Sequence, residues 1–185
     1  NYIFNISASR GGIGIYRGSG GTGGTSSGIY LDSSNDNSFE NNTIYLLTGG
    51  VGGPGGGAHG SVGAGGFATG FILIDSDSNL FLYNKIHNIT GGKATTKNTF
   101  GGNVASLSTA GAGVGVTIYS SDSNSFKSTK IENLFAGNMF TRSNDGNIQG
   151  SDGFTTAFWL RDTLSYTNTL TPTHQISGYN VPKTS

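Results

Sequence analysis

The ten carboxylates and three histidines of this chain are the side chains best suited to acid–base or metal chemistry. Asp77 and Asp122 occupy equivalent places in two repeated segments, and Asn35 holds that place in another segment. Such a line of oxygen atoms at a turn is one way to bind Ca²⁺. The chain has no Asp-x-Asp-x-Asp loop, however, and these residues also suit turns on a solvated edge. We therefore favour turn chemistry, predict no bound cofactor and keep Ca²⁺ as the one metal candidate.

The other reactive groups give no recognisable catalytic arrangement. His59, His87 and His174 share no repeat position and have no metal-ligand spacing. The absence of cysteine excludes a thiolate zinc site, a cysteine nucleophile and a disulfide framework. Lys85 and Lys130 do share a repeat position, which suits exposed strand residues better than catalysts. We predict no catalytic residue.

Three Asn-x-Ser/Thr sequons are present, at Asn5, Asn41 and Asn88. They are candidate N-glycosylation sites if a glycosylating cell exports the protein. In a chain so rich in Asn, Ser and Thr, a few such matches also arise by chance.

Three segments of the chain repeat one another without gaps, beginning at Gly28, Gly70 and Gly115. An asparagine, a phenylalanine and an isoleucine recur at fixed distances after these glycines. They are Asn37, Asn79 and Asn124; Phe39, Phe81 and Phe126; and Ile44, Ile86 and Ile131. We therefore divide one domain, residues 1–185, into a partial unit at 1–27 and units at about 28–69, 70–114, 115–156 and 157–185, the last degraded and shifted in register.

Each unit is expected to contain three short strands, at Gly28–Leu31, Ser38–Glu40 and Thr43–Leu47 in the first copy, because β-branched and aromatic residues alternate there. Three such strands cannot bury their apolar side chains alone. Stacked copies that pair in parallel would bury the recurring Phe and Ile. The recurring asparagines would then form a ladder, with hydrogen bonds between neighbouring units.

The pattern Asn-x-Phe-x-x-Asn-x-Ile, at 37–44 and 79–86, resembles the parallel β-helix repeat superfamily. That superfamily includes pectate lyases, alginate epimerases, phage tailspikes and adhesin-like surface proteins. The third copy departs from the pattern, with Thr129 in place of the second Asn. The resemblance implies an all-β fold, a right-handed parallel β-helix (β-solenoid) of about four rungs, but it implies no single function.

Glycine-rich inserts of similar length separate the strand triplets, always at the same corner. They lie at about Ala8–Ser27, Val51–Thr69, Lys93–Val114 and Asn138–Thr156. Two interpretations stay open: flexible linkers, or an ordered second layer of extended chain in which glycine permits close backbone approach. A strict Gly-x-x period is missing from the sequence, so we reject collagen and do not favour a polyproline-bundle antifreeze protein.

The overall composition excludes several classes of function. Formal net charge is zero with no Lys/Arg cluster, so we predict no nucleic-acid binding. The longest apolar run, Phe71–Ile74, is far too short for a transmembrane helix. Scarce charge and frequent Tyr and Phe also argue against global disorder.

These features favour a structural or adhesive protein of the extracellular space or cell surface. Unpaired strand edges at the ends of a solenoid predict a homo-oligomer or filament with head-to-tail contacts, unless the chain is a fragment of a longer protein. The alternatives are a carbohydrate-active β-helix enzyme, of the lyase or epimerase kind, and a passive glycan-binding or ice-binding module.

Overall fold

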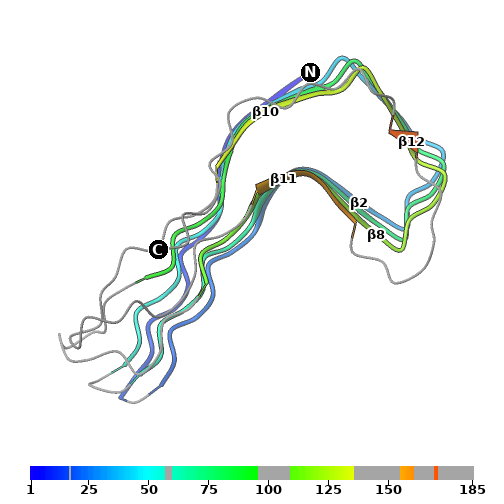
Figure 1. Ribbon diagram of the computed structural model, residues 1–185. Coiled ribbons are helices and arrows are strands. Elements are labelled where there is room, and N and C mark those ends of the chain that lie inside the picture. Colours follow the sequence, from blue (N-terminus) through cyan, green and yellow to red (C-terminus); the bar gives the residue numbers. More distant parts are fainter. Residues whose placement is uncertain (17, 57–59, 96–108, 136–154, 161–168, 171–185) are drawn as a thin grey trace.

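The computed structural model describes residues 1–16, 18–56, 60–95, 109–135, 155–160 and 169–170, the last two ranges by their backbone only. This part of the chain contains strands and no helix (Figure 1). The strands are β1 (Tyr2–Ser7), β2 (Ser26–Asp32), β3 (Ser38–Glu40), β4 (Thr43–Thr48), β5 (Ala68–Ile74), β6 (Leu80–Leu82), β7 (Lys85–Thr90), β8 (Gly113–Tyr119), β9 (Ser125–Lys127), β10 (Lys130–Phe135), β11 (Thr155–Leu160) and β12 (Thr169–Leu170). Nothing that could serve as a membrane-spanning helix occurs within these ranges.

The strands form three parallel sheets, each of which takes one strand from each of the three gapless repeats and one from a flanking unit. Sheet A has the order β1-β4-β7-β10, sheet B the order β11-β8-β5-β2 and sheet C the order β12-β9-β6-β3. Every pairing is parallel. The fold is therefore all-β, and equivalent strands of successive units lie directly beside one another (Figure 1).

The register of the sheets confirms the repeat alignment. Ile44 lies opposite both Ile3 and Ile86, and Ile86 lies opposite Ile131. In the degraded last copy, Leu170 lies opposite Phe126, so this unit holds two more residues in its first turn than the third unit does. The predicted strands are present, with one or two extra residues at the ends of the first and third strands.

The core lies between the three sheets and consists of stacked, equivalent side chains. The rings of Phe81 and Phe126 are nearly parallel, with centroids 4.3 Å apart, and both are buried. Ile44, Ile86 and Ile131 are fully buried, as predicted. Phe39 was expected to be buried but is only partly so. Its β3 strand is the outermost in sheet C, so one face of the ring has no neighbouring unit to cover it.

Left-handed backbone residues turn the chain at four equivalent places in each unit. One set follows sheet B strands (Ser33, Asp75, Ser120), one precedes sheet C (Asp36, Ser78, Ser123), one follows it (Asn41, Tyr83, Ser128), and one lies within the sheet A strands (Asn5, Leu46, Asn88, Asn133). Asn, Asp and Ser can stabilise this conformation through local hydrogen bonds. The Asn, Asp and Ser that recur between strands therefore bend the chain at the corners between the sheets.

The described parts of the first three inserts form an ordered array of extended chains. We call this array the glycine arm (residues 8–16, 18–25, 49–56, 60–67, 91–95 and 109–112), and it projects from the sheets at the lower left of Figure 1. Its outgoing and returning runs make two layers. Gly52 donates to Lys93 O of the next outgoing run (2.9 Å), whereas Gly53 donates to Gly21 O of a returning run (2.8 Å). The arm is thus a hydrogen-bonded second structure, and the linker interpretation does not hold for these residues.

A period of three does govern the arm, contrary to the expectation from the sequence. In 49–56 the first glycine of each triplet donates within its layer and the second donates between layers. The third residue, Val51 or Pro54, accepts a hydrogen bond at its carbonyl oxygen from the preceding unit. This bond does not involve the residue's own N–H, so proline, which has none, is accommodated. About three residues per turn is the geometry of polyproline-II-like chains. The frame is constant through the first insert, from Gly11 to Gly23, but shifts by one residue within the second, between Gly52 and Gly65. Most of the fourth insert lies outside the described residues.

Candidate functional site

Asparagine side chains connect the units along the turn before sheet C. Asn79 Oδ1 accepts from the backbone N–H of Asn37 (2.9 Å) and from its side-chain Nδ2 (3.0 Å). Asn124 Oδ1 accepts the same pair of bonds from Asn79, at 3.0 and 3.1 Å. Asn79 and Asn124 are buried, whereas Asn37 at the edge is exposed. These amides satisfy backbone groups that would otherwise be buried without partners.

A second amide ladder follows sheet C and is broken in the third unit. Asn42 donates to Asn84 Oδ1 through its backbone N–H (2.9 Å) and its Nδ2 (3.0 Å), and Asn1 Nδ2 donates to Asn42 Oδ1 (2.9 Å). Thr129 occupies the next place. Its hydroxyl is buried and has no hydrogen-bond partner in the described structure. The departure from the asparagine pattern is therefore a local defect in an otherwise bonded column.

Serines and carboxylates make two further columns at the corner between sheets B and C. Ser76 Oγ accepts the Ser34 N–H (3.1 Å), and Ser121 Oγ accepts the Ser76 N–H (3.0 Å). Asp77 Oδ1 accepts the N–H of Asp122 (2.6 Å), the next carboxylate in its column. Turn chemistry thus accounts for the aligned acids. No group of three or more potential metal-ligating His, Cys, Asp or Glu residues occurs in the part of the chain that the structure describes.

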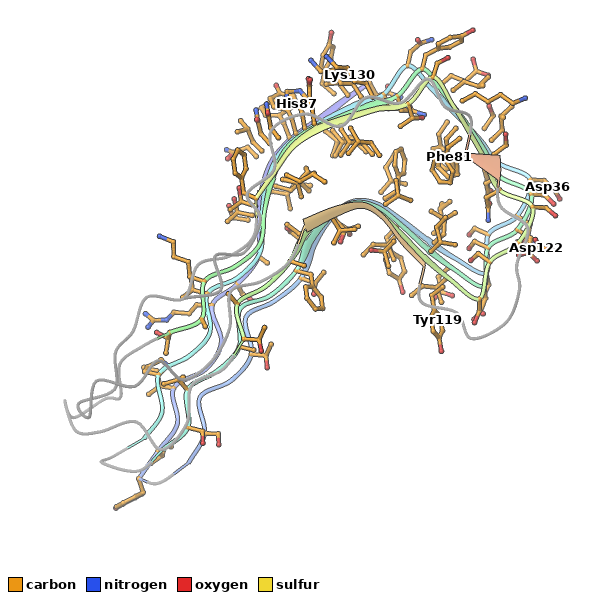
Figure 2. All side chains as sticks on the ribbon, in the orientation of Figure 1. Asp36, Phe81, His87, Tyr119, Asp122 and Lys130 are labelled. Atoms are coloured by element: carbon orange, nitrogen blue, oxygen red, sulfur yellow. The ribbon has the colours of Figure 1, made fainter. Side chains whose placement is uncertain are left out.

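The outer face of sheet A carries the densest set of reactive side chains, and Figure 2 shows His87 and Lys130 on this face. Phe4, Tyr45 and His87 come from successive strands and stack in a row, with ring centroids 5.1 Å apart at both steps. Glu132 continues the row on β10, opposite His87. We call these four residues and the adjacent Lys85 and Lys130 the outer row.

Glu132 links the two lysines of the outer row. Its carboxylate oxygens lie 3.2 Å from Lys85 Nζ and 2.8 Å from Lys130 Nζ. The hydrogen bond from Lys130, with help from Lys85, lowers the pKa of Glu132 below its usual value. Partial burial and the nearby lysine charges lower the pKa of His87, so the imidazole is neutral at pH 7. The row therefore has a formal charge of +1 from two ammonium groups and one carboxylate.

The outer row presents both aromatic rings and charged groups on one face of sheet A. Both lysine ammonium groups form ion pairs with the same carboxylate. The edges of the stacked rings face outward. The Tyr45 hydroxyl, the His87 imidazole and the two lysine ammonium groups can donate hydrogen bonds to an anionic or hydroxyl-rich ligand. The predicted absence of a catalytic residue stays a prediction, because His59, His174 and other chain segments lie outside the described residues.

The three sequons all sit on left-handed backbone. Asn5 and Asn41 are exposed, and Asn88 is half-buried on the outer face of sheet A. Asn5 and Asn88 occupy equivalent places within β1 and β7. Local backbone conformation explains the recurrence of Asn here, and glycosylation stays a prediction.

Three of these arrangements were not predicted from the sequence: the ladder of Asn42 and Asn84, the serine column and the outer row. The serines at 34, 76 and 121 recur at one repeat position, so the signal was available. Within the outer row only Lys85 and Lys130 gave such a signal, because Phe4, Tyr45, His87 and Glu132 are different residue types that share only a strand position. No family model, curated protein or solved structure matches the chain.

Proposed function

We propose that this chain is a segment of a right-handed parallel β-solenoid that acts as a structural or adhesive protein at a cell surface or in an extracellular fibre. One observation carries the proposal. Many polar side chains form columns of hydrogen bonds that join each unit to the next. These columns are the two ladders through Asn79 and Asn84 and the serine column. Such columns stiffen a rod and present flat faces, whereas a catalytic centre needs convergent groups.

Assembly follows from the outermost strands. β1, β2 and β3 each have a neighbour on one side only, and a parallel edge is a template for further pairing. A second copy stacked head to tail would cover these edges and propagate. Continuation of the same polypeptide would cover them equally well.

Light scattering after size exclusion, followed by electron microscopy, tests the proposal on purified chain. Concentration-dependent growth into rods is the expected result. A monomer that persists at high concentration contradicts self-assembly and leaves the fragment interpretation, in which the units continue within one longer chain.

A glycan-binding module is the second candidate, and the outer row favours it. An extended acidic polysaccharide could lie across sheet A, with its carboxylates near Lys85 and Lys130 and its hydroxyls near Tyr45 and His87. Binding should be measured by calorimetry with a polyuronate. Lys85→Ala with Lys130→Ala should remove that binding, and Lys127→Ala on sheet C is the matched control. Shortening of the polymer during the measurement would indicate the carbohydrate-active enzyme instead.

A further inference from the structure

Charge is segregated between the inserts and the sheets. In the first three units, the inserts at 8–25, 49–67 and 91–112 contain four cations, Arg10, Arg17, Lys93 and Lys97, and no carboxylate. The strands and turns at 26–48, 68–90 and 113–135 contain seven carboxylates and three lysines, a formal charge of −4. The zero net charge of the chain therefore conceals a basic part and an acidic part.

The basic part is exposed on the outgoing layer of the glycine arm. Arg10, Val51 and Lys93 are third-position residues of successive outgoing runs, so they form one row. Arg10 and Lys93 are exposed and have no carboxylate partner among the described residues. Ile13 and Tyr16, farther out on the first run, are 61% and 84% exposed. The layer thus combines unpaired cations with apolar side chains, a composition typical of an interaction surface.

The acidic part lies at the opposite end of the molecule. We call it the acidic corner: Asp32, Asp36, Asp75, Asp77 and Asp122, on the turns between sheets B and C. Figure 2 shows Asp36 and Asp122 at this corner, on the side of the sheets away from the arm, with Tyr119 close by. Asp32 and Asp36 are exposed and form no ion pair in the described structure.

We propose that the glycine arm of one copy docks on the acidic corner of a second copy, side by side. The two surfaces have opposite charge, and each has unpaired charged groups. The arm and the corner also share an axial repeat, because the parallel strand spacing of about 4.8 Å separates successive units in both. Charged side chains can therefore meet at matched heights along the two stacks, which favours a second copy over an irregular anionic partner. This lateral contact is separate from head-to-tail stacking and does not require it.

Charge reversal with mixing tests the contact on the full chain. Self-association is measured by sedimentation velocity at about 0.05 M and about 0.5 M NaCl, because salt screens exposed charges. The variants are Arg10→Glu with Lys93→Glu, and Asp32→Lys with Asp36→Lys. In the described structure none of these four side chains forms a hydrogen bond to another unit, and thermal melting of each variant checks the fold. Each variant alone should associate at least about tenfold more weakly than the natural chain at low salt.

An equimolar mixture of the two variants should regain association, because each reversed surface meets its complement. Thr22→Glu with Thr25→Glu, on the returning layer of the same arm, is the control and should leave association within about twofold. No self-association at low salt, or no recovery in the mixture, overturns the proposal. The proposal is also overturned if the chain stays monomeric and instead binds phosphatidylglycerol vesicles or polyphosphate through Arg10 and Lys93. Loss of head-to-tail rods with the lateral contact intact would count only against the proposed filament.

Discussion

At the scale of single residues, Asn79 shows how one side chain joins three units. Its Oδ1 accepts two bonds from Asn37, its N–H and Nδ2 donate to Asn124 Oδ1, and its Nδ2 also lies 2.9 Å from Ser34 O. Asn79→Leu would leave buried backbone groups unpaired, so we expect a loss of about 1–3 kcal/mol in the free energy of unfolding. Urea denaturation measures it. Asn37→Leu, at the exposed end of the column, should cost less than half as much, and equal losses would contradict the ladder.

Thr129 offers the opposite test, because a substitution there should stabilise the protein. An asparagine would place an acceptor below Asn84 and extend the column that now ends at an unpaired hydroxyl. We expect Thr129→Asn to raise the free energy of unfolding by about 1 kcal/mol. Thr129→Val removes the unpaired hydroxyl without extending the column and should give a smaller gain. A less stable Asn variant would mean that the column cannot continue into the third unit.

His87 should make stability depend on pH near neutrality. Its pKa is lowered below 6.5 in the folded state, so the unfolded chain binds a proton first as pH falls. The contribution of His87 to the free energy of unfolding is fully present well above pH 6.5 and is lost as the pH falls below that value. Glu132 acts in the same direction, but only below its ordinary value of 4.5. Glu132 therefore adds nothing between pH 8 and 5, and the difference between the natural chain and a His87 variant in this range isolates His87 from His59 and His174. His87→Phe keeps the ring stack and should flatten the profile, and an unchanged slope would reject this assignment.

At the scale of elements, the glycine arm depends on backbone contact. A Cβ atom on Gly53 would overlap the Gly12 carbonyl oxygen, whereas a Cβ atom on Gly12 would meet nothing within 4 Å. Gly53→Ala should therefore lower the free energy of unfolding by about 1–3 kcal/mol, while Gly12→Ala should change it by less than about 0.5 kcal/mol. Thermal melting of the pair distinguishes a packed arm from a loose one, in which both substitutions would be mild.

Sequence reasoning predicted the strands better than the arm, and the reason is physical. Phe39, Phe81 and Phe126 recur because each packs on its equivalent in the next unit, so core stacking leaves a repeat in the sequence. In the arm, close backbone contact requires only that a side chain be absent, and the frame of three shifts within the second insert. Val62 even occupies a first position there. The outer row was not predictable, because nothing in its stacking requires equivalent residues to be alike.

At the scale of the whole molecule, two modes of association are proposed along perpendicular directions. Head-to-tail stacking would continue the three parallel sheets along the axis of the units. Lateral docking would join the glycine arm to the acidic corner and should weaken with salt. Both would make the chain a building element of a fibre or surface layer, with sheet A left free to contact a glycan.

The most direct test of the structural role is the power spectrum of rods imaged by electron cryomicroscopy. If units stack head to tail, strands cross the rod and their spacing of about 4.8 Å runs along its axis. The account predicts a meridional layer line at that spacing in rods formed by the purified chain. Particles that remain single, or rods whose strand spacing lies across the axis, would contradict it.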